Sequence, residues 1–193
     1  PGLISKVNID GTLNDPSDMD KGWSVDYVKA PELDRVHEVW GKIVMGSSTL
    51  DGLAEVVKPE TAAYLERMLT VHDVQSLTLD EALIERRRLR RLWSAFLTDY
   101  TVAIGPTWAN LPWPIDSDLD PDKGVELLRE SWAFITPGNA LGLPSVALPM
   151  SVSDGLPTGI QVYSEVYRED LCLMASEIIE SETQCPTPID PVK

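Results

Sequence analysis

Two neighbouring serines, Ser47 and Ser48, come nearest in type and spacing to a nucleophile for acyl chemistry. Lys42 lies five residues before Ser47 and is the lysine closest to them in the sequence. An attacking serine also needs backbone N–H groups near the developing oxyanion, and glycines allow that approach. The segment Met45–Leu50 has one glycine, Gly46, and it precedes the serines. We therefore predict a helix end with capping serines here rather than a catalytic site.

Other patterns of hydrolase and metal chemistry are missing from the sequence. There is no Gly-x-Ser-x-Gly elbow, no Gly-rich phosphate loop and no candidate set of Ser, His and Asp. His37 and His72 stand 35 residues apart, without the cysteine or carboxylate spacing of a metal site. The sequence therefore predicts no metal and no other cofactor.

Charge and composition limit the partners. The chain has 193 residues and a formal net charge of −15, which repels phosphate backbones and anionic membranes. No stretch approaches the ~20 apolar residues that span a bilayer. We therefore expect neither nucleic acid nor a membrane as a partner. The sequence opens at Pro1 without an initiator Met, as a nicked, processed or truncated protein would.

The two cysteines indicate the compartment. Cys172 falls in an apolar helical pattern and Cys185 in a proline-rich tail, so we expect two free thiols. Free thiols are typical of a reducing compartment, which favours a cytoplasmic location.

Helices follow from apolar periodicity. The clearest begins at Thr78, where Thr78 and Glu81 can form a capping box, and extends to about Tyr100. Its arginine run, residues 86–91, is predicted to be a solvated face that pairs with acidic residues of the same helix. The alternative is a site for an anion or an acidic partner. Further helices are predicted at about residues 31–46, 59–69, 124–135 and 168–180.

Strands are predicted at residues 101–104, 145–148 and 159–163. The last two form a hairpin with a long turn through residues 153–157. Residues 1–30 indicate loops and one short strand. Strands that alternate with amphipathic helices indicate an α/β fold.

Residues 106–114 combine two tryptophans, Trp108 and Trp113, with three prolines. The prolines constrain the backbone, and the segment directly follows a predicted buried strand. Rigid loops in this position commonly form the wall of a binding site.

Two motifs follow in the last third of the chain. Thr136–Pro149 reads T-P-G-N-A-L-G-L-P-S-V-A-L-P, and Gly155–Gln161 reads G-L-P-T-G-I-Q. In this order and spacing, before a last helix with an acidic start, they resemble the C-terminal half of the amidase-signature family. The resemblance covers residues 78–180 well. We therefore predict a loosely matched helical and loop segment at 1–77 and the C-terminal part of an amidase-signature domain at 78–193.

The resemblance implies a mixed β-sheet flanked by helices. It also implies a catalytic set of a nucleophilic Ser, a second Ser joined through a cis peptide bond, and a Lys. That set belongs to the family's N-terminal half, in a stretch like G-G-S-S-G-G that this sequence lacks. We therefore assign no catalytic residue to this chain and expect it to be inactive alone. Its expected partner is the N-terminal half of the same enzyme, either as a separate chain or as a missing part, and the complete enzyme is a possible homodimer.

The resemblance also implies that this half lines the substrate pocket. The matching candidates for contact with a small-molecule amide are Trp108, Trp113, Ile135, Thr136 and Asn139. The tryptophans would form a broad apolar wall, and Thr136 and Asn139 polar contacts. The alternative is that both tryptophans pack in the core or between the two halves. Asn139 and Gln161 are expected to serve mainly as structural pins.

Three functions remain open from the sequence. The preferred one is hydrolysis of a carboxylic amide, aryl or otherwise apolar, through an acyl-enzyme. The second is the amidotransferase branch of the family, which releases ammonia from glutamine for transfer onto aminoacyl-tRNA. The third is a structural or regulatory fragment with an amidase-like fold and no chemistry.

Overall fold

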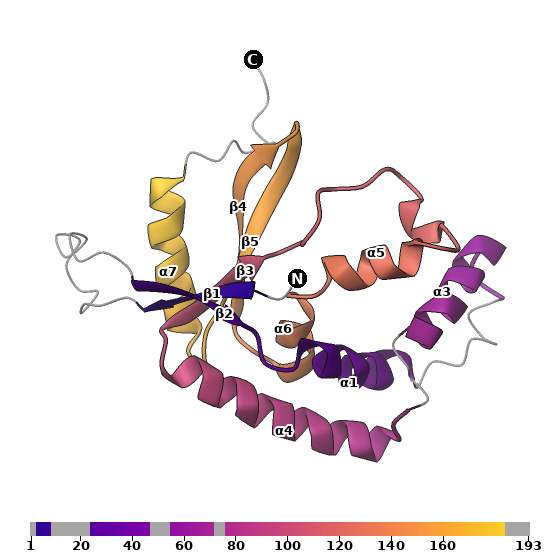
Figure 1. Ribbon diagram of the computed structural model, residues 1–193, viewed down its shortest axis with the longest axis horizontal. Helices are drawn as coiled ribbons and strands as arrows, with labels where there is room; N and C mark the ends of the chain where they lie inside the picture. Colours follow the sequence, from indigo (N-terminus) through magenta and orange to yellow (C-terminus); the bar gives the residue numbers. More distant parts are fainter. Residues whose placement is uncertain (1–2, 9–23, 47–54, 72–75, 184–193) are drawn as a thin grey trace.

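The computed structural model describes residues 3–8, 24–46, 55–71 and 76–183 (Figure 1). Its framework is a five-stranded sheet with strand order β2-β1-β3-β5-β4. The strands are β1 (Leu3–Asn8), β2 (Ser24–Lys29), β3 (Val102–Pro106), β4 (Ser145–Ser153) and β5 (Leu156–Tyr163). The α-helices are α1 (Leu33–Met45), α3 (Pro59–Val71), α4 (Leu79–Thr98), α5 (Gly124–Ser131), α6 (Thr136–Leu141) and α7 (Glu169–Glu182), and η2 (Ser117–Leu119) is a short 3-10 helix. The α/β class is confirmed.

The sheet differs from the mixed one that the resemblance implies, because all four pairings between the described strands are antiparallel. The chain crosses over from β3 to β4, and these two strands run in the same direction. The hairpin from β4 then places β5 between them. No parallel pair is therefore adjacent in this part of the chain.

Side chains that alternate along the strands divide the core between the two faces of the sheet. Val102 and Val162 point to one face and pack with Cys172 of α7. Ala103 and Tyr163 point to the other face, in a larger core shared with α1, α4 and α6. Figure 1 shows α7 alongside the strands, with α1 and α6 on the other side of them. The sheet is thus covered by different helices on its two faces.

Two hairpins depart from the sequence prediction. The turn between β4 and β5 has only two residues, Asp154 and Gly155, with φ angles of 51° and 78°. Asp-Gly suits two consecutive positive φ angles, which match the twist of the flanking strands, so β4 and β5 continue to the turn. At the other end of the sheet, residues 1–30 contain two paired strands, β1 and β2, in place of the one short strand expected.

The predicted helix at 124–135 is shorter than expected, and a helix that was not predicted follows it. α5 ends at Ser131, and α6 begins at Thr136 with Pro137 in its first turn. Proline lacks an N–H and is tolerated only in a first turn, so a new helix begins here instead of α5 continuing. The other predicted helices are confirmed with small shifts at their ends, and the capping box of Thr78 and Glu81 is present at the start of α4.

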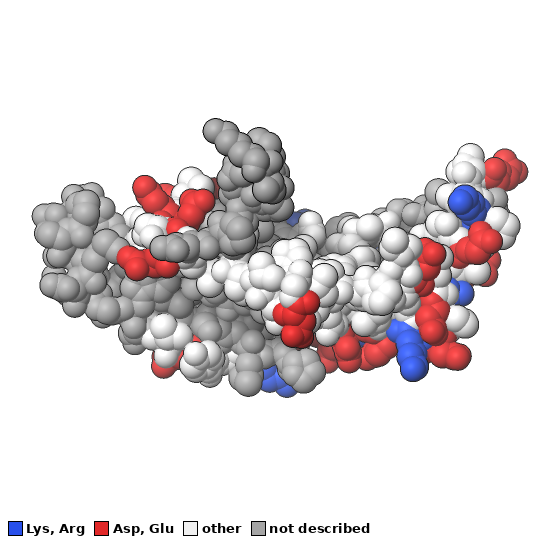
Figure 2. Space-filling model, turned by 90° about the horizontal axis from the view of Figure 1, so that it is seen from above, with Lys and Arg blue, Asp and Glu red and all other residues white. Residues whose placement is uncertain are grey.

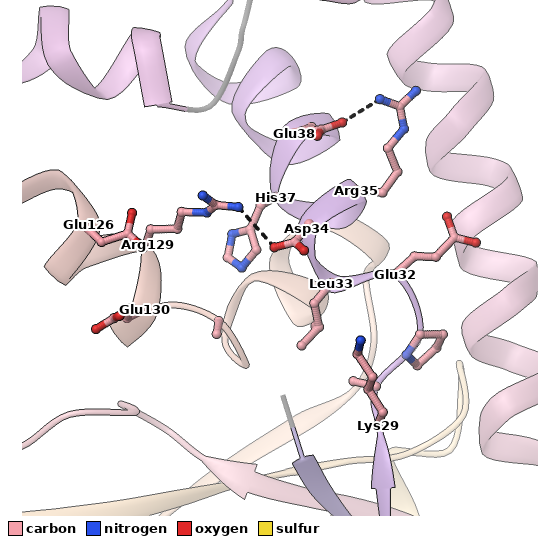
Figure 3. Close-up of a pocket in the computed structure, with 13 residues that line it drawn as sticks. Lys29, Glu32, Leu33, Asp34, Arg35, His37, Glu38, Glu126, Arg129 and Glu130 are labelled. Atoms are coloured by element: carbon pink, nitrogen blue, oxygen red, sulfur yellow. Dashed lines mark hydrogen bonds and ion pairs between the residues drawn. The ribbon is translucent and has the colours of Figure 1, made fainter. Parts of the chain in front are cut away.

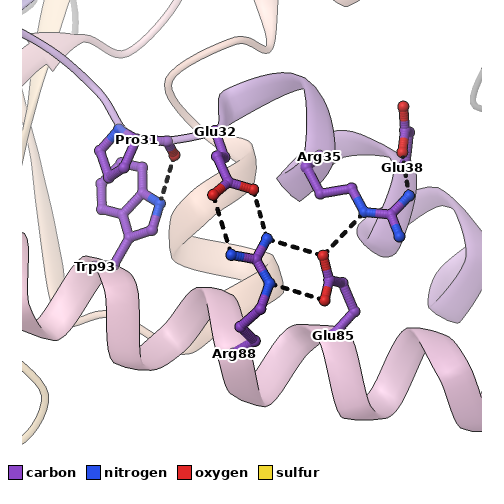
Figure 4. Close-up of polar contacts among 7 residues, drawn as sticks. All are labelled: Pro31, Glu32, Arg35, Glu38, Glu85, Arg88 and Trp93. Atoms are coloured by element: carbon purple, nitrogen blue, oxygen red, sulfur yellow. Dashed lines mark hydrogen bonds and ion pairs between the residues drawn. The ribbon is translucent and has the colours of Figure 1, made fainter.

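An ionic network joins the first turn of α1 to α4 (Figure 4). Arg88 forms two hydrogen bonds with Glu32 and two with Glu85. Glu85 also accepts a hydrogen bond of 3.0 Å from Nε of Arg35, and Arg35 pairs with Glu38. Forked guanidinium–carboxylate pairs of this kind fix orientation as well as distance. The network therefore sets the angle at which α1 leaves β2.

Two contacts to backbone oxygens strengthen the same junction. Nε1 of Trp93, fully buried in α4, donates to the carbonyl oxygen of Pro31 at 3.1 Å. Arg86 donates to the carbonyl oxygen of Ala140 in α6. The arginine run was predicted to pair within its own helix, but among the described residues only Arg88 with Glu85 does so. The run instead ties α4 to its neighbours.

The network predicts an acid-sensitive contribution to stability. Hydrogen bonds from Arg88, above all, lower the pKa of Glu85 from 4.5 to about 2. Since the pKa in the folded state lies below that in the unfolded state, the ionised carboxylate stabilises the fold above about pH 4.5, and this contribution disappears toward pH 2. We expect Glu85→Gln to lower the free energy of unfolding by about 1–2 kcal/mol near neutral pH. The difference from the parent should narrow between pH 4.5 and 2 in urea unfolding.

Glu126→Gln is the matched control, because Glu126 is exposed on α5 and makes no ion pair within the described residues. It should leave stability unchanged across the same range of pH. A gap between the parent and Glu85→Gln that stays constant with pH would contradict the assignment.

Candidate functional site

The aromatic loop after β3, residues 107–114, is held at both of its sides. The N–H of Thr107 donates to the carbonyl oxygen of Gly159 in β5 at 3.1 Å. The N–H of Ala109 donates to the carbonyl oxygen of Ser131 at the end of α5, and Nδ2 of Asn110 donates to the Ser131 hydroxyl at 2.9 Å. The loop therefore has a defined position between the sheet and α5.

Four tryptophans form a chain of ring contacts through this region. The centroids of Trp108 and Trp113 lie 5.0 Å apart, and Trp108 meets Trp132 edge to face at 6.5 Å. Trp132 in turn meets Trp40 of α1 at 5.6 Å. Offset and edge-to-face pairs of this kind are the favourable arrangements of aromatic rings. The structure thus brings together the two tryptophans that the sequence predicts as a binding wall.

These tryptophans also belong to a second, smaller core. Trp108 and Trp113 are half-buried and pack against Met68 of α3 and against Val125 and Leu128 of α5. Part of each ring therefore stabilises the protein, and part remains accessible. Core packing, one of the two interpretations offered by the sequence, is therefore present for part of each ring, and the binding wall stays a prediction.

The other predicted contacts lie in α6 and at its N-terminal cap. Ile135, the N-cap residue, is half-buried. Thr136 is buried, and its hydroxyl donates to the carbonyl oxygen of Trp132 at 3.0 Å. Asn139 is exposed. The geometry therefore favours Asn139 over Thr136 as a polar contact for a ligand.

A phenol group fixes α6 against the sheet. The Tyr163 hydroxyl, from β5, donates toward the carbonyl oxygens of Phe134 and Ile135 at 2.7 and 3.1 Å. It also accepts the N–H of Gly138 at 3.3 Å. Burial raises the pKa of the Tyr163 phenol, so it stays protonated and can donate. One side chain thus binds three backbone groups around the start of α6.

Two glycines make room for this arrangement. A Cβ atom at Gly138 would lie 2.9 Å from the Tyr163 ring, and one at Gly105 would lie 2.6 Å from the Phe134 ring. Both distances are shorter than packed side chains allow. The glycine of the T-P-G-N motif is therefore required by Tyr163, which lies two residues after the end of the G-L-P-T-G-I-Q motif.

Gln161, which ends that second motif, lies in β5 opposite Gly105 of β3 and Ala147 of β4. Its side chain is buried, and its Oε1 atom has no hydrogen-bond partner among the described residues. The expected role of Gln161 as a structural pin stays a prediction.

A cavity of about 810 Å³ opens between α1, α5 and the end of β2 (Figure 3). None of the five predicted contacts lines it. Charged side chains of both signs surround it, and Arg129 pairs with Asp34 across it at 3.1 Å. Its acidic residues are Glu32, Asp34, Glu38, Glu126 and Glu130. This lining does not suit the apolar group that the tryptophans would bind.

The sequence predictions on the Met45–Leu50 segment, on metal ligands and on membrane spans are taken in turn. Met45 ends α1, and Gly46 caps it by donating its N–H to the carbonyl oxygen of Lys42, as expected for a helix end. Ser47 and Ser48 lie outside the described residues. In the described ranges no three His, Cys, Asp or Glu side chains gather as metal ligands. No helix in those ranges is both long enough and apolar enough to cross a bilayer.

Sequence reasoning missed two residues of this region, Trp132 and Tyr163. Trp132 joins the ring chain, and its carbonyl oxygen accepts from the N–H groups of Ile135 and Thr136 at 3.1 and 3.2 Å. Its position four residues before Thr136, in the first turn beyond α5, was the available signal. Tyr163 gave a weaker one, since a tyrosine at the end of a strand does not reveal a partner 25 residues away.

A family model and two curated relatives match this chain, and all of them are amidase-type proteins. A family model described as Amidase matches residues 22–173, which includes part of the loosely matched segment 1–77. The indoleacetamide hydrolase of Bradyrhizobium japonicum is 30% identical over 164 residues, 82% of this chain and 35% of that relative. The A-type subunit of the glutamyl-tRNA(Gln) amidotransferase of Clostridium kluyveri is 26% identical over 104 residues, 54% of this chain and 20% of that relative.

A solved structure described as a crystal structure of amidase has the same fold over 78% of this chain and 36% of its own, with a TM-score of 0.61 and 24% identity. The chain thus spans about a third of the length of the hydrolase and of the solved amidase, at 35% and 36%.

The hydroxyl contacts of Tyr163 predict a specific loss of stability. We expect Tyr163→Phe to lower the free energy of unfolding by about 1–3 kcal/mol, because the N–H of Gly138 and the carbonyl oxygens of Phe134 and Ile135 lose their partner in a buried site. Tyr167→Phe is the matched control, since Tyr167 is 80% exposed. Urea unfolding followed by tryptophan fluorescence measures both. Equal effects of the two substitutions would contradict the role assigned to Tyr163.

Proposed function

This chain belongs to the amidase family, and from that membership we propose that it forms part of an enzyme that hydrolyses a carboxylic amide to an acid and an amine. The family match over residues 22–173 carries the proposal. The nucleophile would lie outside these 193 residues, since the sequence has no Gly/Ser-rich stretch of the kind that holds one. This part of the enzyme would complete the sheet and line the substrate pocket.

The charge distribution supports a partner on one face. Figure 2 shows mostly uncharged residues across the middle of the face seen from above, with acidic side chains gathered toward its ends. Apolar side chains are also exposed in the β4–β5 hairpin and after the aromatic loop, at Val152, Leu156 and Ile115. Uncharged surface in a chain of net charge −15 is typical of an interface. We propose that the N-terminal part of the same enzyme covers it.

The N-terminal part of the enzyme would supply the nucleophile, and this chain would hold the substrate. In an acyl-enzyme route the nucleophile attacks the amide carbonyl carbon, the amine leaves with a proton, and water then releases the acid. The residues of this chain would act before and between those steps, by holding the substrate. The accessible parts of Trp108 and Trp113 would bind an aryl or other apolar group, and Asn139 would offer hydrogen bonds at the edge. Indoleacetamide, the amide in the name of the Bradyrhizobium japonicum hydrolase, carries an aryl group and agrees with that preference.

A second candidate is release of ammonia from glutamine by an A-type amidotransferase subunit. The similarity to the Clostridium kluyveri protein favours it. The net charge of −15 disfavours direct contact with tRNA, which another subunit would then have to bind. An obligate companion that accepts ammonia would distinguish this function from simple amide hydrolysis.

We expect the purified 193-residue chain to show no turnover of indole-3-acetamide, because it lacks the nucleophile. Co-expression with the polypeptide that supplies the rest of the amidase domain should restore turnover, measured as ammonia release. Turnover by the chain alone would contradict the proposal that the nucleophile lies outside these 193 residues. If Ser47→Ala then abolished that turnover, the nucleophile would lie in Met45–Leu50. An N-terminal part without a Gly/Ser-rich segment, and no turnover in the complex, would favour the fragment without chemistry.

The tryptophan wall predicts a change in specificity. In the restored complex we expect Trp113→Ala to raise KM for indole-3-acetamide about tenfold, a loss of about 1.4 kcal/mol of aromatic contact, and to change KM for propionamide little. Trp113→Phe should keep most of the affinity because it retains a ring. Equal losses for both amides would show that Trp113 acts through folding alone.

A further inference from the structure

Two buried polar groups lie close together on one face of the sheet. Gln161 of β5 is only 6% exposed, and neither its Oε1 atom nor the Oγ1 atom of Thr107 has a hydrogen-bond partner among the described residues. A Cβ atom at Gly159 would lie 3.5 Å from Oγ1 of Thr107. This hydroxyl therefore lies over Gly159, two residues from Gln161 on the same face of β5. Buried polar groups in folded proteins are almost always hydrogen-bonded, so both groups require a partner.

The sheet beside these groups is open and built from small residues. Ala147 of β4 is paired with Gln161, and Pro149 is paired with Gly159. Ala147 and Pro149 are both exposed, whereas nearer α6 the Phe134 ring packs against the same face. Small residues on a strand allow another backbone to approach closely. The two polar groups therefore border a part of the sheet that no described element covers.

A polypeptide segment fits this place better than a small-molecule substrate does. Neither Thr107 nor Gln161 lines the cavity, and small molecules are bound in concave sites rather than on the face of a sheet. Both side-chain oxygens can accept hydrogen bonds. Residues two apart in a strand are separated by about 6.6 Å, which is also the spacing of the N–H groups on one side of an extended segment. Such a segment can therefore donate to both oxygens.

We propose that Oε1 of Gln161 and Oγ1 of Thr107 accept hydrogen bonds from backbone N–H groups of the N-terminal part of the same enzyme. This inference rests on the partner proposed above, and it adds the residues and the kind of bond through which that partner docks. The occupant follows from length, because this chain spans only 35% of the Bradyrhizobium japonicum hydrolase and 36% of the solved amidase. Thr107 directly precedes Trp108, so the docked segment would also fix the start of the aromatic loop.

The isolated 193-residue chain gives the first test, because a group that pins this chain internally and a group that docks a partner respond differently to substitution. Gln161→Leu and Thr107→Val each replace a buried polar group by an apolar one of similar shape. Since the proposed hydrogen-bond donors lie in another part of the enzyme, we expect the midpoint of urea unfolding to stay unchanged or to rise in both variants. A lower midpoint in either variant would place its partner within these 193 residues and overturn the proposal.

The second test measures association in the restored complex. Parent and variant chains with different tags compete for a limiting amount of the N-terminal part, and the captured ratio gives their relative affinity. We expect Gln161→Leu and Thr107→Val each to lose at least about tenfold, because a buried N–H of the segment loses its acceptor. Thr107→Ser keeps the hydroxyl and should retain most of the affinity. Thr98→Val is the matched control, since it removes an exposed hydroxyl at the end of α4, and it should equal the parent.

The outcomes distinguish this contact from the proposed function. Variants that compete as well as the parent would overturn the docking contact and leave the proposed hydrolase intact. If the same variants instead raised KM for indole-3-acetamide, the two groups would contact the substrate, which also contradicts docking. A parent chain that captures no N-terminal part would refute the proposed partner and the contact together.

Discussion

The position of one phenol, Tyr163, determines how the rest of this structure is arranged. Its hydroxyl binds the carbonyl oxygens of Phe134 and Ile135 and the N–H of Gly138, so the last residue of β5 holds the turn that starts α6. Burial makes these bonds matter, because a backbone group that lost its partner here would have no water to replace it. The same ring requires glycine at position 138 and meets the Phe134 ring at 4.9 Å. Each of these contacts crosses from the sheet to α6, which explains why the two motifs of the last third occur together.

Two further sets of contacts connect α6 and the residues before it to the rest of the structure. α6 carries the carbonyl oxygen of Ala140, which accepts from Arg86. α4 in turn holds the start of α1, because Arg88 pairs with Glu32 and Glu85 accepts from Arg35. In the other direction, the backbone before α6 leads to Trp132, whose ring joins Trp40 of α1 to the aromatic loop. The proposed substrate wall packs in the smaller core, and the contact of Trp132 with Trp40 links that core to the larger one that contains Tyr163. A loop of this kind can offer flat aromatic surface without losing its position, because its backbone is bound to Gly159 and Ser131.

Local signals predicted much of this fold, and contacts distant in sequence account for what they missed. The capping box at Thr78 and the apolar face of α4 depend on residues a few positions apart, so the sequence was sufficient for them. α6 was not predicted, although Pro137 in its first turn is a local signal for the start of a helix. The pairing of Arg88 with Glu32, 56 residues away, depended on how α1 packs against α4, and helical spacing favoured nearer acids instead. Trp108 and Trp113 were predicted as a pair, whereas Trp132 and Tyr163 become visible only once β5, α5 and the loop are brought together.

Charged residues differ in role between the partly buried contacts and the outer surface. The ionic network of α1 and α4 is partly buried, and its carboxylates are matched by Arg35 and Arg88, so it holds elements within the chain. Charged side chains without ion pairs in the described ranges remain on outer faces, such as Arg87 and Arg91 of α4 and Glu177 and Glu180 of α7, while the face seen in Figure 2 is mostly uncharged across its middle. A surface with these three regions distinguishes between two kinds of contact. The uncharged region favours a permanent partner that excludes water over a wide area, and the charged helix faces favour a weaker, salt-dependent contact. The N-terminal part proposed above would therefore cover the uncharged region rather than the charged helix faces.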